Sequence, residues 1–366
     1  MSLTRNVRQT LMLLASIALI VAAGTSGAAQ TITASPFVIG IVHLGSIRDG
    51  GYNQAHAEGI RIMQKNLPNV RVLQAENIPD ADVERVIEGM VRRGAKLIFA
   101  ASFGFQDPAL TVARRYPDVK FEHPGGFRLA PNFGNYWAST QEAFYLMGIA
   151  AGSVTKTNKI GFVVALPISF FLANINAFHL GARSVNPRVE TRVVFTGTFL
   201  DPGKEATATN ALLDQGADIM AMIVDSPITV VEIAERRGAF SVGYHFIGLQ
   251  KFAPKGWISG VAFTWGNLYT RIVKQAIDGT WKSERKFYGI DCDCLTLAPF
   301  GSAVPARVVR MVRASEQAII SGQLHIFQGP IRDNRGVTRV EAGRVLTGED
   351  YGRMDWLAEG IVGAPR

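Results

Sequence analysis

Apolar residues along the chain follow two alternating patterns, short continuous runs and longer stretches with helical spacing. The stretch 82–93 shows the helical pattern, because its apolar residues recur at i, i+3, i+4, i+7 and i+8 on one face. These residues are Val83, Val86, Ile87, Met90 and Val91. Gly94 ends this predicted helix, and the apolar run 97–100 begins a predicted strand. Strands that alternate with helices in this way predict βαβ units around a parallel sheet.

The chain carries this unit twice, with its landmarks in the same order. In the first copy they are IGIVHLG (39–45), NQAHAEG (53–59), RRGAKLIFA (92–100) and DVKFEH (118–123). In the second copy they are IGFVVALP (160–167), NAFHLG (176–181), DQGADIMAMIV (214–224) and SVGYH (241–245). The duplication predicts an α/β fold with two doubly wound parallel-sheet lobes.

Two such lobes predict a ligand cleft between them, because loops beyond the carboxyl ends of parallel strands form the crevice of these sheets. The loops expected to line the cleft are 44–53, 101–107 and 123–128 from the first copy and 166–175, 196–201, 225–227 and 245–250 from the second.

Candidate ligand contacts in the first copy lie in two of these loops. Tyr52 offers an aromatic face, and the Asn53 amide is able to pair with a base edge. Asp49 is a candidate acceptor for a ligand donor. Asn53 and Asp49 also suit a helix cap and an Asx turn before Gly50 and Gly51, so both interpretations stay open.

At the end of the strand 97–100, Ser102 offers a hydroxyl and Phe103 a stacking face. A second interpretation has Phe103 filling its own lobe. In the second copy the adjacent loop aromatics Phe170 and Phe171 predict that at least one of them faces the cleft, and Phe171 is the candidate contact. Asp225 follows an apolar strand and suits either a ligand contact or a helix cap, and Trp265 provides a further stacking face.

Composition supports a globular protein. Apolar residues make up 48% and charged residues 19% of the 366 residues, and the net charge is +8. The Lys and Arg residues are scattered among acids, so we expect no nucleic-acid partner. We also expect a monomer. After the first thirty residues, no apolar run reaches the length of a membrane span.

The first residues have the pattern of a secretory signal. Arg5 and Arg8 precede the apolar run 11–23, and small residues around Ala29 suit cleavage. Residues 1–29 are therefore expected to be a cleavable signal peptide. No cysteine follows the run, so we expect a periplasmic protein without a lipid anchor.

Only two cysteines occur, Cys292 and Cys294. Two inert thiols, a local disulfide, or a metal or redox role are all open for them. The GxSxG, HExxH, P-loop and GxGxxG motifs are absent, and the six histidines lack metal-ligand spacing. We therefore expect no metal, no cofactor and no catalysis.

Several segments together resemble the basic membrane protein family of ABC-transporter substrate-binding proteins, which includes purine nucleoside receptors. They are GGYNQAHAEG (50–59), PDVKFEHPGGF (117–127), NFGNY (132–136), YLMGIAAG (145–152), NINAFHLGARSVNP (174–187), FLDPGKE (199–205), GADIMAMIVDSP (216–227), WGNLY (265–269) and FQGPIRDNRG (327–336). The resemblance extends from about Phe37 to Gly363.

The resemblance implies a type I periplasmic-binding-protein fold with three crossovers between the lobes, and delivery of the ligand to an ABC permease at the inner membrane. It implies a first lobe of 36–138 plus about 258–284, a second of 139–257 plus about 285–330, and a C-terminal extension of 331–366 packed on the lobes. Tyr52 and Asn53 correspond to base-contacting positions, and Phe103, Phe171 and Asp225 are looser transfers.

One departure from the family pattern concerns the ligand. Nucleoside-binding relatives carry an acidic residue shortly after the strand that matches VGYH, whereas here the chain continues Phe246-Ile247-Gly248-Leu249. A carboxylate suits ribose hydroxyls, so its loss favours a purine nucleobase over a nucleoside. The alternatives are a periplasmic nucleoside hydrolase with Asp49 or Asp225 activating water, and a ligand sensor for a membrane receptor.

Overall fold

The computed structural model describes residues 35–365, and the residues from Phe37 onward form one compact unit. The expected signal peptide lies outside the described residues. The strands are β1 (Phe37–His43), β2 (Val70–Ala75), β3 (Leu97–Ala101), β4 (Lys120–Pro124), β5 (Phe133–Ala138), β6 (Lys159–Val164), β7 (Glu190–Phe195), β8 (Ile219–Ile223), β9 (Phe240–His245), β10 (Trp257–Phe263), β11 (Arg285–Tyr288), β12 (Leu295–Leu297), β13 (Ile331–Arg332), β14 (Thr338–Val340) and β15 (Ile361–Val362).

Helices connect most of these strands. The α-helices are α2 (Tyr52–Asn66), α3 (Val83–Arg92), α4 (Gln106–Arg115), α5 (Thr140–Val154), α6 (Ser169–Val185), α7 (Pro202–Asp214), α8 (Ile228–Arg236), α9 (Gly266–Ile277), α10 (Ala306–Ile320) and α11 (Gly348–Tyr351). Short 3-10 turns are η1 (Asp80–Asp82), η2 (Phe103–Phe105) and η3 (Ile247–Phe252). Among residues 35–365, no helix is long and apolar enough to cross a membrane.

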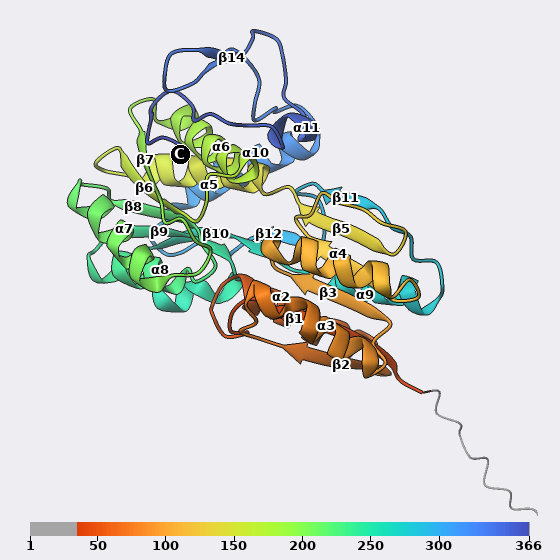
Figure 1. The fold of residues 1–366 in the computed structure, drawn as a ribbon. Coiled ribbons are helices and arrows are strands. Elements are labelled where there is room, and N and C mark those ends of the chain that lie inside the picture. The colour runs from red at the N-terminus through yellow and green to blue at the C-terminus, as the bar shows by residue number, and fades with distance from the viewer. Residues whose placement is uncertain (1–34, 366) are drawn as a thin grey trace, which may run out of the picture. The chain divides into compact units, whose positions relative to one another are not determined.

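The strands form two large sheets with one plan. The first has the order β11-β5-β4-β3-β1-β2 and the second the order β12-β10-β9-β8-β6-β7-β15 (Figure 1). The first five strands of the second copy, β6 to β10, thus take the places of β1 to β5. Neighbouring strands are parallel except for β10 and β12. The predicted duplication and the α/β fold of two parallel-sheet lobes are confirmed.

Helices cover both faces of each sheet, which explains the continuous apolar strands. β3 and β8, with the sequences LIFAA and IMAMI, are buried along their whole length. A parallel strand covered on both faces has no solvent side and needs no polar alternation. α3 and α4 pack on one face of the first sheet, and α2 and α9 lie together on the other.

Two glycines set the position of α6, the helix whose start reaches the cleft. A Cβ on Gly148 of α5 would lie 1.9 Å from the carbonyl oxygen of Phe178, and a Cβ on Gly181 of α6 would lie 2.0 Å from that of Tyr145. Only glycine allows two helix backbones to approach this closely. The close pairing of α5 and α6 therefore depends on these two positions.

The chain crosses between the sheets three times, as the resemblance implied. The crossings follow β5, β10 and β11. The expected boundary needs correction, because β10 pairs with β9 and belongs to the second sheet, whereas 258–284 was assigned to the first lobe. β11 pairs with β5 and belongs to the first sheet, not the second. In Figure 1 the late elements α9 and β11 accordingly lie with the elements of the first lobe.

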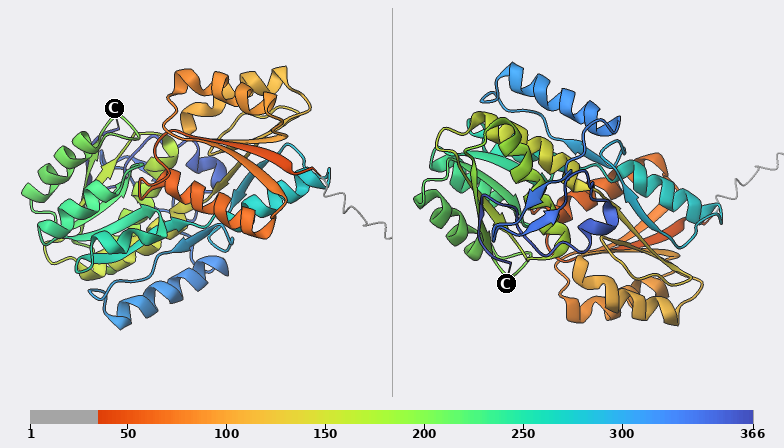
Figure 2. Two further views of the ribbon diagram at one scale, coloured as in Figure 1. Left: turned by 90° about the horizontal axis from the view of Figure 1, so that it is seen from below. Right: turned by 90° about the horizontal axis from the view of Figure 1, so that it is seen from above.

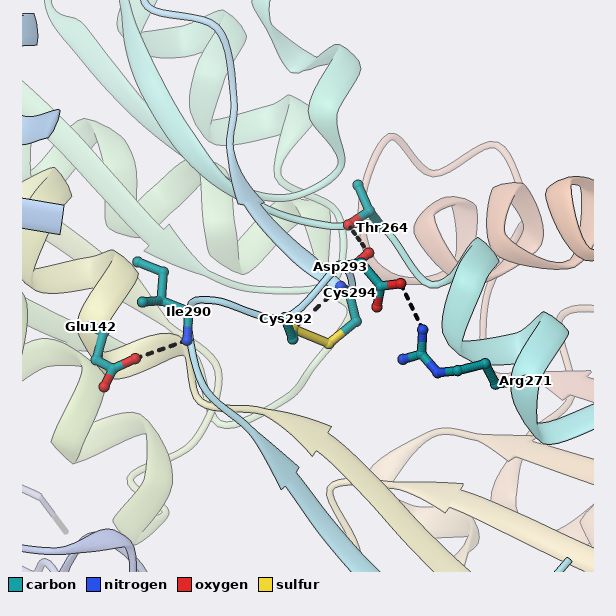
Figure 3. The surroundings of a disulfide bond; sticks show 7 residues. All are labelled: Glu142, Thr264, Arg271, Ile290, Cys292, Asp293 and Cys294. Carbon is teal, nitrogen blue, oxygen red and sulfur yellow. Dashed lines mark hydrogen bonds and ion pairs between the residues drawn. A yellow bond between two sulfur atoms is a disulfide. The ribbon is translucent and has the colours of Figure 1, made fainter. Parts of the chain in front are cut away.

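The third crossing carries a disulfide bond between Cys292 and Cys294, which decides between the open alternatives for these cysteines. Figure 3 shows that its neighbours tie the crossing to both lobes. The Ile290 N–H donates to Glu142 of α5 at 2.9 Å, and Arg271 of α9 pairs with Asp293 at 2.6 Å.

The C-terminal extension packs on the second lobe. β15 adds a strand beside β7, and β13 and β14 form a small antiparallel pair. The right-hand view of Figure 2 looks onto this segment, drawn in dark blue with α11. Contacts between α11 and α6 hold the short helix near the start of α6.

Asp49 forms the start of α2. Its carboxylate accepts from the backbone N–H groups of Gly51, Asn53 and Gln54 at 2.8–3.0 Å and from the Asn53 side-chain amide at 2.7 Å. The N–H groups of a first helical turn have no partner within the helix, so a carboxylate here stabilises the helix. The Asx-turn interpretation of Asp49 therefore describes its contacts.

We predict that Asp49→Ala lowers the free energy of unfolding by about 1–2 kcal/mol, because it leaves the first turn of α2 without its acceptor. Asp49→Asn, which keeps one acceptor, should lose less. Urea unfolding measures both. Unchanged stability together with lost ligand affinity would instead place Asp49 at the ligand.

Replacing both Cys292 and Cys294 by Ser should lower the stability by less than about 2 kcal/mol, because the bond closes a very short loop. Thermal unfolding with and without dithiothreitol measures the effect in the wild type, and the double variant serves as the control that the reductant must leave unchanged. A loss large enough to unfold the protein would contradict this local role.

Candidate functional site

A cavity of about 1050 Å³ lies where the carboxyl ends of both sheets meet. Every one of the predicted cleft loops contributes to its lining. The residues are Tyr52, Ser102, Phe103, Pro124, Gly125, Phe127, Trp137, Ser139, Gln141, Ile168, Ser169, Phe170, Phe171, Phe199, Ile223, Asp225, Tyr244, His245, Arg285, Phe287, Thr347, Gly348, Glu349, Tyr351, Gly352 and Arg353.

The cavity brings together five of the eight residues proposed from the sequence, namely Tyr52, Ser102, Phe103, Phe171 and Asp225. The first three come from the first lobe and the last two from the second. The Tyr52 N–H donates to the Asp225 carbonyl at 3.4 Å, so the two lobes already touch at the base of the cleft.

Asp49, Asn53 and Trp265 do not line this cavity, which differs from the sequence-based proposal. Asp49 is engaged at the start of α2. Asn53 is fully buried, where its amide oxygen accepts from the Gly45 N–H at 3.2 Å and its NH₂ group donates to Asp49. Its polar atoms are taken up inside the first lobe.

Trp265 lies behind the cavity wall. It is fully buried and stacks on Phe263 at 4.5 Å and on His56 at 5.3 Å. His56 in turn hydrogen-bonds Tyr269, and its ring packs against Tyr52 at 4.4 Å. Trp265 therefore supports the cavity residue Tyr52 from behind instead of presenting a face to the cleft.

Aromatic side chains form a continuous wall from one lobe to the other. Phe103 of the first lobe contacts Phe199 of the second, and Phe199 contacts Phe171, both with ring centroids 6.2 Å apart. Phe170 continues the wall to Trp137 of β5 at 5.3 Å. Such a wall suits a flat ligand, because aromatic rings favour stacked and edge-to-face contacts.

Asp225 and His245 form a polar pair at the ends of the neighbouring strands β8 and β9. Their side chains are 3.8 Å apart between Oδ1 and Nε2. Burial, followed by the nearby Asp49 and Glu205, raises the pKa of Asp225 well above its usual value. Burial lowers the pKa of the His245 imidazole well below its usual value. Both shifts favour the neutral forms, so the pair offers donors and acceptors without net charge.

The backbone at His245 is held in an uncommon conformation. Its φ is 72°, in the left-handed region, and the Phe246 N–H donates to the Tyr244 carbonyl at 3.0 Å across it. A tight turn of this kind is strained for a non-glycine residue, and such strain concentrates at functional sites. The turn holds His245 at the cavity beside Asp225.

Three buried polar atoms of lining residues lack a hydrogen-bond partner within residues 35–365: the indole Nε1 of Trp137, the hydroxyl of Tyr244 and the Nδ1 of His245. A buried polar group without a partner costs about 1–3 kcal/mol. The protein covers all three atoms in this structure, so a ligand pairs with them only once the lobes or the side chains around them move. Within the same residues, no cluster of three His, Cys, Asp or Glu side chains suits a metal ion.

Sequence reasoning missed three groups of lining residues. His245 ends β9, and His123 lies one residue before the end of the corresponding strand β4, so its position in the repeat was a usable signal. Trp137 is the second-last residue of β5, next to the first crossing. The third group is the outer rim, formed by Arg285 and Phe287 of β11 and by 347–353 of the extension, and only the folded chain brings it to the cleft.

Comparisons with known proteins agree with this geometry. Residues 37–327 match the family model described as ABC transporter substrate-binding protein, PnrA-like. The chain is 34% identical over 325 residues to a purine-binding protein of Brucella abortus, covering 88% of this chain and 92% of the relative. It is 32% identical over 288 residues, 79% of this chain and 73% of the relative, to a Haloferax volcanii protein named provisionally as an ABC-transporter glucose-binding protein.

Among solved structures, a solute-binding protein of an ABC transporter from Aeropyrum pernix superposes with a TM-score of 0.70, covering 87% of this chain and 96% of that chain at 20% identity. This likeness confirms the two-lobed fold of solute-binding proteins. The family model spans both lobes and every crossing. The chain therefore belongs to the PnrA-like family of ABC-transporter substrate-binding proteins.

Proposed function

We propose that this protein captures a purine, preferentially a free nucleobase, between its lobes. The observation that carries the proposal is the Asp225–His245 pair, 3.8 Å apart, next to an aromatic wall in one cavity. A purine is flat, neutral and edged with both donors and acceptors. Its faces suit the aromatic wall, and its edges suit the pair and the Trp137 indole N–H.

The choice of nucleobase over nucleoside rests on the carboxylates that reach the cavity. Asp225 lies deep in the cleft, where the proposal assigns it to the edge of the base, and Glu349 lies at the outer rim. The segment after β9, where nucleoside-binding relatives carry an acid, is the turn η3, whose sequence IGLQKF contains no acidic residue. The name of the Brucella relative supports a purine, whereas that of the Haloferax relative supports a sugar, so glucose belongs in the test.

The physiological setting proposed here is import. A cleavable signal delivers the protein to the periplasm, closure of the lobes traps the purine, and the closed form docks on an ABC permease. A receptor-docking sensor has the same cleft and differs in its membrane partner. Pull-down of a permease from membranes, with and without purine, separates the two.

Isothermal titration of the purified, refolded protein tests the ligand. Adenine, guanine and hypoxanthine are expected to bind, with adenosine and inosine weaker and glucose not binding. A purine at about 100 Kd also adds about 2.7 kcal/mol of stability, which a thermal melt detects. Binding of glucose alone, or of none of these compounds, contradicts the purine proposal. Free base accumulating from inosine beyond one equivalent would favour the hydrolase.

The protonation state of Asp225 gives a pH-dependent prediction. The neutral carboxyl persists above its usual range because burial raises its pKa. Purine affinity of the wild type should therefore stay constant at acidic pH and fall as pH rises through the raised pKa. Asp225→Asn, which stays neutral, should bind within a few-fold of the wild type and lose this pH dependence.

Titrations at a series of pH values measure both proteins, and Asp225→Leu, which removes donor and acceptor together, should lose most of the affinity. An Asn variant that binds as weakly as the Leu variant would show that the ligand requires the charged carboxylate.

A further inference from the structure

The C-terminal extension reaches the cleft through residues 344–358, here called the strap. The strap lies beyond the segment that matches the family model, which ends at residue 327. Asn176 of α6 anchors it with both ends of its buried amide. Its NH₂ group donates to the Trp356 carbonyl at 2.9 Å, and its oxygen accepts from the Ala358 N–H at 2.8 Å.

The strap has a defined structure at the cleft. Thr347 and Asp350 form a reciprocal capping box at the start of α11, and Arg344 pairs with Asp350 at 2.9 Å. Tyr351 packs on Phe327, with ring centroids 5.3 Å apart. These contacts stabilise the first turn of a helix too short to persist alone. The strap is therefore a fixed wall of the second lobe.

One side of the strap forms part of the cavity lining. The lining includes Glu349 and Arg353, which are four residues apart, together with Tyr351. Glu349 is exposed and is the strap's only carboxylate in the lining. Within residues 35–365 it takes part in no ion pair.

The first lobe presents a complementary edge to the same cavity. Arg285 and Phe287 alternate along the edge strand β11, so their side chains share a face. The Arg285 guanidinium lies over the Phe287 ring at 4.6 Å and has no ion-pair partner within the described chain. Phe287 is 49% exposed and Phe127, also in the lining, 56% exposed.

We propose that the strap is the surface on which the first lobe closes, with Glu349 pairing with Arg285 across the mouth of the cleft. Closure buries the exposed rings of Phe127 and Phe287, which supplies an apolar driving force. The opposite charges of Glu349 and Arg285 determine the position in which the first lobe docks on the strap. Glu349 is thus a positioning residue for ligand retention, and this role rests on the proposed capture of a ligand by closure.

Charge exchange tests the pair. Glu349→Arg and Arg285→Glu should each weaken adenine binding about fivefold, mainly through faster release, and the double variant should recover to within about twofold of the wild type. Glu341→Arg is the matched control, since it reverses a charge on the same extension away from the cavity lining and should bind like the wild type. Stopped-flow release rates and titrations measure the four proteins beside the wild type.

Small-angle scattering of the same proteins without adenine gives a readout that needs no purine. At low salt the single variants should be more open than the wild type, and the double variant should return to the wild-type curve. The pairing is contradicted if the losses of adenine affinity in the two single variants add up in the double variant and the scattering curves of all the variants equal that of the wild type. If the wild type binds no purine but the scattering shows the exchange, the purine proposal fails and the closing surface stands.

Discussion

Burial of Asp225 and His245 side by side is the constraint on which the rest of the cleft depends. His245 ends β9, and Asp225 follows the neighbouring strand β8 by two residues, so the topology brings both to the cleft. Burial drives both toward their neutral forms, which leaves a polar pair that is costly to maintain without partners. A ligand whose edge carries complementary donors and acceptors offsets that cost. The strained backbone at His245 therefore serves binding, because it holds the imidazole at the cavity.

The scaffold around the pair serves to keep the two lobes in register while allowing closure. Gly148 and Gly181 fix α6 against α5, and the start of α6 carries Phe170 and Phe171 into the cleft. The crossings join the lobes at one side, and the disulfide stiffens one of them. The strap then extends the second lobe beyond its own loops, so that the mouth of the cleft has two walls.

The sequence predicted the fold and much of the cleft, and the reasons for its failures are physical. Helical periodicity and the repeat sufficed for two parallel-sheet lobes, and Tyr52, Phe171 and Asp225 from the predicted cleft loops line the cavity. Asn53 and Asp49 have the chemistry of ligand contacts, but they satisfy each other at the start of α2. The sequence shows which hydrogen-bonding groups a side chain carries. It does not show whether a ligand or another part of the protein satisfies them.

The outer rim was beyond prediction for a different reason. β11 and the strap come from late parts of the chain that fold back to the cleft. Neither is a loop that follows a strand of the repeated unit, so the repeat did not predict their position. The same returns misled the expected lobe boundary near residue 258, because β10 resembles any other apolar strand until its neighbour β9 is known.

The central claim is that buried polar atoms of the lining take a purine as their hydrogen-bond partner. Nitrogen–proton NMR of the tryptophan indoles tests it most directly, with Trp137→Phe assigning the resonance. On addition of adenine the Trp137 indole proton should move downfield, while that of Trp265, which is buried but outside the lining, should stay. A Trp137 resonance that does not move up to the solubility limit of adenine contradicts the account.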